Sequence, residues 1–283
     1  MPYVALITGA SSGIGEAAVR RVAQMPDTRV VLVARREDRL RALAEEIGGA
    51  TVIAQDLLEP SGASRIRRMV ERDLGELHLL VNNAGQAWRG RFDEKGWANV
   101  DRHMKLNFEA PVRLTQELLP LLRRTASSGR GRRVAIVNVA STAGRVSRPG
   151  SGAYSASKFA LAGWSDALYA EERAHGVHVG LVLPGFVRTE GFPARELLSS
   201  VFTRWLVSRP EVVAEAILEA GPGVKPERYV PRGYWMAAAA RILAPNLVRR
   251  ATSGGKFTPA AGSGGGSDGA SGPARESTAA RAH

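Results

Sequence analysis

The chain has 283 residues and no cysteine, which excludes disulfide bonds, thiolate metal sites and a cysteine nucleophile. Its apolar fraction of 44% is ordinary for a soluble protein with a large core. It contains no uninterrupted apolar run of about 18 residues, so no membrane-spanning helix is predicted. The first residues lack the basic flank and small-residue cleavage site of a signal peptide, and we therefore expect a cytoplasmic protein.

The net charge is +12, with a sequence pI near 10.8. Such a charge can attract nucleic acid or an anionic membrane surface. However, the arginines are scattered over segments with helical patterns, and the aromatic residues are not interleaved with them as base stacking would require. We expect no nucleic-acid partner, and we keep contact with a membrane surface as an alternative.

Short apolar segments alternate with helical patterns along most of the chain. The predicted strands are Tyr3–Thr8, Arg29–Ala34, Thr51–Gln55, His78–Val81, Arg133–Val139, Val177–Leu183 and, more weakly, Arg228–Pro231. The clearest helical patterns are Arg39–Ile47, Ala63–Leu74, Met104–Arg124 and Tyr154–His175. Several strands are apolar at successive positions, which is typical of parallel strands covered on both faces. We therefore predict an α/β fold, a doubly wound parallel sheet of the Rossmann type in a single domain.

The composition places the end of this domain near residue 250. An amphipathic stretch at 232–250, with Trp235 and terminal arginines, is predicted to be helical. It can lie on a membrane surface, pack on the core or cover the pocket. Residues 251–283 are rich in Gly, Ser and Ala, and we predict a disordered tail.

A glycine-rich turn follows the first strand and precedes a helix. It reads Thr8-Gly9-Ala10-Ser11-Ser12-Gly13-Ile14-Gly15. Glycines allow a sharp turn and let a pyrophosphate approach the free N–H groups at the helix N-terminus. Such a turn is a weak signal alone, but its position between strand and helix favours dinucleotide binding.

The second strand indicates which dinucleotide is bound. NAD-binding sites usually place an acid at the end of this strand, where it binds the ribose hydroxyls. This chain has Arg35 and Arg36 there. Guanidinium groups bind a 2′-phosphate through charge-assisted hydrogen bonds, each worth about 1.5–3 kcal/mol. The sequence therefore predicts NADP (NADPH) as the cofactor.

Further motifs occur in a fixed order along the chain. They are Asp56-Leu57 after the third strand, Asn82-Asn83-Ala84-Gly85 after the fourth, Asn107, Ser141 after the fifth, Tyr154-Ser155-Ala156-Ser157-Lys158, and Pro184-Gly185 after the sixth. Together with the glycine turn, this set resembles the short-chain dehydrogenase/reductase family over nearly all of residues 3–231.

The resemblance implies a set of cofactor contacts. Asp56 and Leu57 are expected at the adenine, and Asn83, Ala84 and Gly85 on the adenine-ribose side. The segment from Pro184 to Thr189, with Gly185 and Val187, is expected at the nicotinamide. Ser12 stands where NADP-using members often carry a basic residue, which leaves Arg35 and Arg36 as the predicted partners of the 2′-phosphate.

Tyr154 and Lys158 are candidates for catalysis, although such a pair on a helix is, taken alone, more often a surface pair. Residues four apart lie one turn apart on the same face of a helix. A free phenol has a pKa of about 10, and nearby positive charges favour its ionised form. Tyr154 can then give or take the proton of the reacting oxygen, while Ser141 holds that oxygen.

By resemblance, Lys158 also grips the nicotinamide ribose, and Asn107 holds a water in a proton relay. We therefore predict an NADP-dependent enzyme, an oxidoreductase that interconverts a carbonyl and a primary or secondary alcohol. The histidines show no metal-ligand spacing, and we predict no metal and read all five as structural or exposed. The alternatives kept open are a cofactor-binding regulator without turnover and a basic protein at a membrane surface.

Residues 189–209 occupy the segment that forms a substrate lid in the family. Apolar residues there and just before it suggest a hydrophobic substrate, although they can equally belong to the core; they are Phe186, Phe192, Leu197, Leu198, Phe202, Trp205 and Leu206. Trp88 and Arg89 also fall where they can face substrate. The helical patterns at Met104–Arg124 and Tyr154–His175 carry more apolar positions than one sheet face needs, and we expect a homodimer or homotetramer.

Overall fold

The computed structural model describes residues 2–128, 131–190 and 206–253. Most of the predicted lid and nearly all of the predicted tail therefore lie outside the described residues. The part described forms a doubly wound α/β structure, which confirms the predicted fold class.

The main sheet has seven strands, all parallel, in the order β3-β2-β1-β4-β5-β6-β9. Their bounds are β1 Tyr3–Thr8, β2 Thr28–Ala34, β3 Thr51–Ala54, β4 Leu79–Asn82, β5 Val134–Val139, β6 Val177–Pro184 and β9 Glu227–Val230. Every predicted strand is present, with ends that differ by at most one residue. A second, two-stranded sheet pairs β7 (Phe186–Val187) with β8 (Val207–Ser208), a pair too short for any periodicity to reveal.

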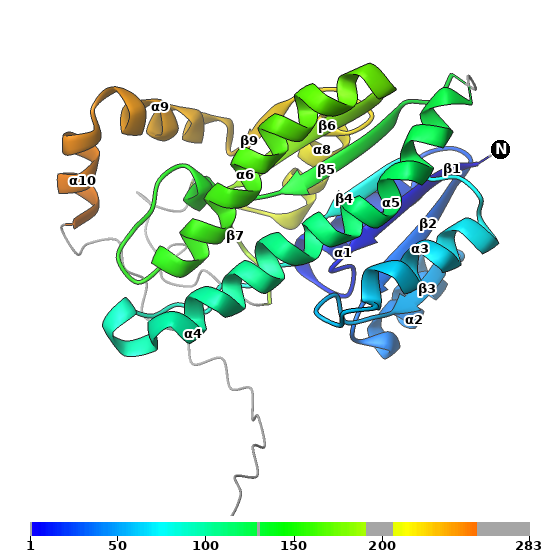
Figure 1. Ribbon diagram of the computed structural model, residues 1–283, viewed down its shortest axis with the longest axis horizontal. Helices are drawn as coiled ribbons and strands as arrows, with labels where there is room; N and C mark the ends of the chain where they lie inside the picture. The colour runs from blue at the N-terminus through cyan, green and yellow to red at the C-terminus, as the bar shows by residue number, and fades with distance from the viewer. Residues whose placement is uncertain (1, 129–130, 191–205, 254–283) are drawn as a thin grey trace, which may run out of the picture.

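Helices cover both faces of the sheet (Figure 1). On one face lie α1 (Gly13–Ala23), α2 (Glu37–Glu46) and α8 (Pro210–Ala220), and on the other α3 (Gly62–Asp73), α5 (Ala110–Ser127) and α6 (Gly152–Glu172). Neighbouring strand residues serve opposite faces, because side chains alternate along a strand. Ile7, for example, packs in the core beneath α1 and α8, whereas Leu6 packs beneath α3 and α5.

The pattern predicted at Met104–Arg124 is more complex in the structure. The helix α4 spans Phe92–Met104, a single π-helical segment follows at Lys105–Glu109, and α5 begins at Ala110. The π segment contains Asn107, one of the predicted site residues. A π-turn inserts one extra residue into a helix and often occurs at functional sites.

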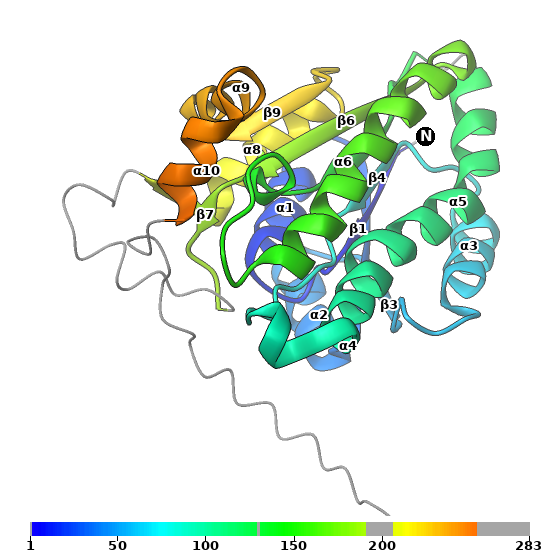
Figure 2. The same cartoon turned by 60° about the vertical axis from the view of Figure 1, so that its left-hand side comes forward.

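The predicted helix at 232–250 is divided into separate elements. A short 3₁₀ turn (Arg232–Tyr234) leads into α9 (Trp235–Leu243), and α10 follows at Pro245–Ser253. Proline cannot donate the helical N–H bond and disfavours helical backbone in the residue before it, so Pro245 begins a new helix. Figure 2 shows α9 and α10 together beyond the β9 edge of the sheet, where Trp235, Ile242, Leu243 and Leu247 are exposed.

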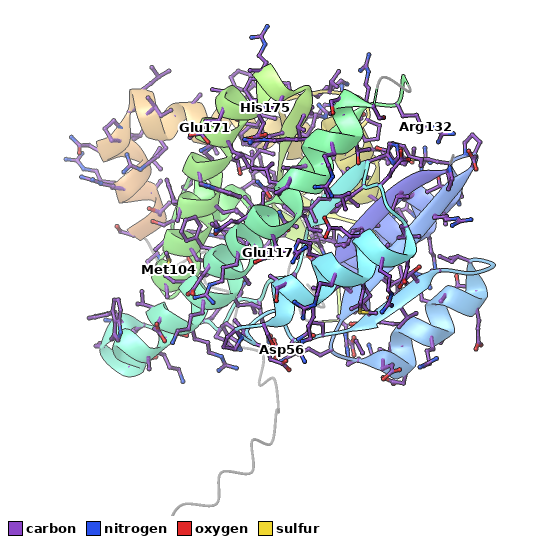
Figure 3. All side chains as sticks on the ribbon, turned by 45° about the vertical axis from the view of Figure 1, so that its right-hand side comes forward. Asp56, Met104, Glu117, Arg132, Glu171 and His175 are labelled. Carbon is purple, nitrogen blue, oxygen red and sulfur yellow. The ribbon has the colours of Figure 1, made fainter. Side chains whose placement is uncertain are left out.

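No helix among the described residues is both long and apolar enough to cross a lipid bilayer. The two rims of the sheet are distinguished in Figure 3 by labelled residues. Asp56, which follows β3, lies at one rim, whereas Arg132 and His175, which precede β5 and β6, lie at the other. Because all strands run the same way, the segments that follow them meet at the Asp56 rim, where open α/β sheets bind ligands.

Candidate active site

The glycine turn after β1 has the shape of a phosphate cradle. Gly9 and Gly13 have positive φ angles of 67° and 59°, which favour glycine. A Cβ on Gly15 would lie 2.2 Å from the carbonyl oxygen of Gly9, so the turn and the helix fit only with glycine there. Ser12 is the N-cap residue of α1 and makes no side-chain cap bond. The first N–H groups of α1 are thus positioned for an anion, and these residues fit a pyrophosphate.

The turn after β4 is fastened to the glycine turn. The hydroxyl of Thr8 accepts hydrogen bonds from the backbone N–H groups of Asn83 and Ala84, both at 3.0 Å. The side-chain amide of Asn83 donates to the carbonyl oxygen of Thr8 at 2.9 Å. Thr189 reaches the same place from the other side, because a Cβ on Gly13 would lie 3.1 Å from its Cγ2. The structure therefore brings three predicted cofactor segments together.

The arginines after β2 differ in their surroundings. The Arg36 guanidinium donates to the hydroxyls of Ser11 and Ser12, with Nη2 distances of 3.1 and 2.8 Å. It therefore lies against the glycine turn. Arg35 is more exposed, and its Nη1 lies 4.0 Å from the carboxylate of Asp56. Asp56 itself accepts a hydrogen bond from the backbone N–H of Leu58 at 2.9 Å. All three charged residues stand at the rim that carries the carboxyl ends of the strands.

The sequence interpretation missed two charged residues at this rim. Arg39 makes two hydrogen bonds to the carboxylate of Glu190, at 2.7 and 3.1 Å. The same carboxylate lies 3.6 Å from Arg36. Glu190 directly follows Thr189, shortly after β7, and is far from α2 in the sequence. Only the tertiary fold brings its carboxylate next to Arg39 on α2. It lies where it can compete with a phosphate for these guanidinium groups.

Ser141 stands at the carboxyl end of β5, next to the end of β6. Its hydroxyl donates to the carbonyl oxygen of Pro184 at 3.2 Å and accepts from the N–H of Ala143 at 3.1 Å. Gly185 follows Pro184, and a Cβ there would meet the ring of Tyr234 at 2.4 Å. The Pro184-Gly185 turn is thus fixed between the serine and the 3₁₀ turn after β9. Val187, a predicted cofactor contact, is buried in the core beneath α1 and α8.

Tyr154 and Lys158 lie one turn apart on α6, as the spacing predicted. The Lys158 Nζ atom is 6.0 Å from the centre of the Tyr154 ring and donates to the carbonyl oxygen of Val139 at 2.9 Å. Burial lowers the pKa of Lys158 to about 8. Burial also raises the pKa of Tyr154, against the opposing effects of Ser141 and Arg89. In the protein without cofactor, the effect of desolvation on the pKa of the phenol is therefore larger than the effects of Ser141 and Arg89, and the phenol is protonated at neutral pH.

Asn107 is completely buried and connects the helices to the turn after β4. Its side chain accepts from the N–H of Gln86 and donates to the carbonyl oxygen of Gln86, both at 2.9 Å, and also contacts the Ser157 hydroxyl at 3.1 Å. A Cβ on Gly85 would lie 2.9 Å from the Asn107 Oδ1 and 3.3 Å from the Lys158 Nζ. Gly85 therefore lies between these two side chains, which places Asn107 beside the predicted pair.

Comparison with known proteins agrees with this geometry. The family model described as short chain dehydrogenase matches residues 3–196. The chain belongs to the short-chain dehydrogenase/reductase family.

Among the described residues, no group of three His, Asp or Glu side chains is arranged to hold a metal ion.

Two curated relatives show how similar this short-chain dehydrogenase is to other members of the family. It is 33% identical over 196 residues to dehydrogenase/reductase SDR family member 7B of Danio rerio, which covers 66% of this chain and 61% of that protein. It is 32% identical over 219 residues to the ketoacyl reductase HetN of a Nostoc strain, covering 76% and 74% of the two chains. The chain thus spans about three fifths of the length of the member 7B relatives.

Solved structures show the same fold. An active-site complex of RhlG with NADP from Pseudomonas aeruginosa superposes with a TM-score of 0.72 at 27% identity, covering 82% of this chain and 96% of the other. A short-chain dehydrogenase from Streptomyces avermitilis gives 0.71 at 29% identity, with coverages of 89% and 99%.

Proposed function

We propose that this chain is an NADP(H)-dependent oxidoreductase that interconverts a carbonyl and a primary or secondary alcohol. The observation that carries the proposal is the convergence of Ser141, Tyr154 and Lys158, with Ser141 hydrogen-bonded to the Tyr154 side chain, beside a glycine turn suited to a pyrophosphate. The family membership supports it. The cofactor, when bound, supplies or accepts the hydride.

The chain's own residues supply the proton and hold the reacting oxygen. The Tyr154 phenol donates its proton to a carbonyl oxygen during reduction, and the raised pKa of this phenol in the free protein favours the protonated form. The Ser141 hydroxyl holds the same oxygen where negative charge develops. Lys158, fixed by the carbonyl oxygen of Val139, keeps its ammonium near the phenol and the predicted ribose position.

The preference for NADP rests on the basic side chains after β2. Arg36 lies against Ser11 and Ser12, and Arg35 and Arg39 stand at the same rim. Three guanidinium groups there favour a 2′-phosphate over a bare ribose hydroxyl. The NADP in the RhlG complex supports the same choice.

A hydrophobic substrate and a homo-oligomer are further parts of the proposal. Phe186 stands next to the Pro184-Gly185 turn; the other apolar residues proposed for the wall are Leu206 and several that lie outside the described residues. An apolar groove of about 240 Å³, lined by Val112, Leu119 and Trp164, separates α5 from α6 and suits a second copy of the chain. On the same two helices, the apolar residues Leu118, Leu122, Leu161 and Leu168 are instead buried in the core. Cytoplasmic residence stays a prediction.

A cofactor-binding regulator without turnover is the second candidate. The presence of Asn107, Ser141, Tyr154 and Lys158 in one site favours the enzyme. A panel of carbonyls and alcohols, assayed with NADPH, NADH and their oxidised forms, decides between them. We expect turnover of some apolar aldehydes or ketones, faster with NADPH than with NADH. Tight NADPH binding without turnover of any compound would favour the regulator.

A further inference from the structure

Two arginines from separate loops lie near each other at the candidate site, and one of them, Arg89, acts on Tyr154. Arg89 lies between β4 and α4, and Arg148 lies between β5 and α6. The two loops are joined by a hydrogen bond of 3.0 Å from the N–H of Gly90 to the carbonyl oxygen of Gly150. Both arginine side chains are half-buried. The loops therefore hold two positive charges on one side of the site.

Arg148 belongs to the same wall as the catalytic serine. Its guanidinium carbon is 4.6 Å from the centre of the Phe186 ring. Phe186 follows Gly185 and Pro184, and the Ser141 hydroxyl donates to the carbonyl oxygen of Pro184. Arg148 also lines a cavity of about 290 Å³ between α4 and the start of α6, so space for a ligand adjoins the guanidinium.

The loop that carries Arg89 is fixed relative to Tyr154. The N–H of Trp88 donates to Nε2 of His103 at 3.0 Å, so the other ring nitrogen carries the proton and donates to the carbonyl oxygen of Asn99 at 2.7 Å. The His103 ring in turn lies edge-on to Tyr154, with ring centres 6.1 Å apart. The charge of Arg89 is close enough to lower the pKa of the phenol. His103 is thus structural, and it holds Arg89 near the reacting group.

The charge of the Arg148 side chain itself has no carboxylate partner among the described residues. Many arginines of this chain pair with carboxylates, as Arg20, Arg67 and Arg123 do. Among the described residues, Arg148 makes no ion pair, and both burial and the positive charge of Arg89 lower its pKa. Holding a partly desolvated cation beside a like charge is unfavourable unless an anion accompanies it.

We propose that Arg148 and Arg89 form an anion subsite that binds a carboxylate or phosphate group of the substrate. The inference rests on the proposed function, because it assigns the substrate class of the same site. The substrate would then be an anionic carbonyl compound, with the reacting oxygen at Tyr154 and Ser141 and the anion at the two guanidinium groups. Its apolar part would contact Phe186, which stacks beneath Arg148.

Aldehydes that differ only in charge test this subsite. Suitable probes are para- and meta-formylbenzoate, their methyl esters and the corresponding formylphenyl phosphates, reduced with saturating NADPH. We expect a kcat/KM about tenfold to a hundredfold higher for at least one anionic aldehyde than for its neutral counterpart, the range of one or two charge-assisted hydrogen bonds. Comparing the two anions shows which group the subsite prefers.

Substitutions assign the effect to the two arginines. R148Q should remove most of the preference for the anion and leave the kcat/KM of the neutral ester within about twofold, which also shows that the variant is folded. R89Q should act in the same direction, and R148K should retain part of the preference. The matched control is R91Q, because Arg91 is exposed in the same loop and pairs with Asp93. Equal kcat/KM values for anionic and neutral aldehydes in the wild type would overturn the proposal.

A binding measurement separates this inference from the proposed function. Calorimetry with para-hydroxymethylbenzoate and its methyl ester, in the presence of NADPH, requires no turnover. Tighter binding of the carboxylate that is lost in R148Q supports the subsite even if no aldehyde is reduced. Equal binding of both compounds, or a preference unchanged in R148Q, contradicts it.

Discussion

The ammonium nitrogen of Lys158 lies 6.0 Å from the centre of the Tyr154 ring while it donates to the carbonyl oxygen of Val139. The end of β5 thus fixes the ammonium group of Lys158, while both Lys158 and Tyr154 lie on α6, one turn apart. Burial favours the neutral form of both side chains, since it lowers the pKa of the lysine to about 8 and raises that of the phenol. In the protein without cofactor the Tyr154 phenol is therefore protonated, as the proposed proton donor to a carbonyl oxygen must be.

Replacing Tyr154 with Phe removes this proton donor and leaves the ring in place. General acid–base catalysis contributes about a hundredfold to ten-thousandfold, so we expect kcat to fall by at least that factor. NADPH binding, measured by fluorescence titration, should change less than about threefold, since the pyrophosphate and adenine contacts are elsewhere. Wild-type turnover in Tyr154→Phe would remove the phenol from the mechanism.

Lys158→Met should make the cofactor-free protein more stable at neutral pH. The fall of the lysine pKa from 10.5 to about 8 means that the folded protein is penalised for holding this charge below pH 8. The penalty is about 3 kcal/mol, and loss of the bond to Val139 offsets part of it, for a net gain of about 1–2 kcal/mol.

The sign of this effect depends on pH. Between about pH 8 and 10.5 the unfolded chain binds more protons than the folded one, so wild-type stability gains with rising pH and the advantage of the variant shrinks. Urea unfolding at pH 7 and pH 10 measures both values. Lys105→Met is the control, because Lys105 is exposed and its pKa is raised by Asp101. A constant difference between the variant and the wild type at the two pH values would contradict the assignment.

Arg36→Ala should weaken NADPH binding by about tenfold to a hundredfold, with a smaller effect on NADH, because a charge-assisted bond to the 2′-phosphate is lost. Arg35→Ala should act in the same direction with a smaller change, since that side chain is more exposed. Arg41→Ala is the control, because Arg41 pairs with Glu37 on α2. Dissociation constants for the two cofactors, measured at one salt concentration, provide the comparison.

Glu190→Gln should tighten NADPH binding by about twofold to fivefold at low ionic strength. The carboxylate pairs with Arg39 and lies near Arg36, and an exposed ion pair of this kind is weak. NADH affinity should stay the same, and the gain should disappear in high salt as charges are screened. Weaker NADPH binding in Glu190→Gln would show that the acid helps to position the arginines.

Several features of the site could be predicted because they are local in the sequence. Tyr154 and Lys158 are neighbours through helical periodicity alone, and the glycine turn is contiguous. The apolar runs predicted the strands, because burial on both faces requires apolar residues at successive positions. Ser141 and Asn107 were located through their order and spacing in a family pattern rather than through local physics.

Contacts between distant segments could not be predicted in the same way. Glu190 meets Arg39 only after β7 returns the chain toward α2, and Arg148 meets Phe186 only because the loops after β5 and β6 end at one rim. The buried state that lowers the pKa of Lys158 also comes from packing rather than from neighbours in the chain. The amino-acid pattern by itself determined the strands, the glycine turn and the pairing of Tyr154 with Lys158, since each depends on residues within one strand, turn or helix. The tertiary structure alone decided which charges share a site, because electrostatic energy depends on separation in space and on exclusion of water, and neither is encoded at any single position.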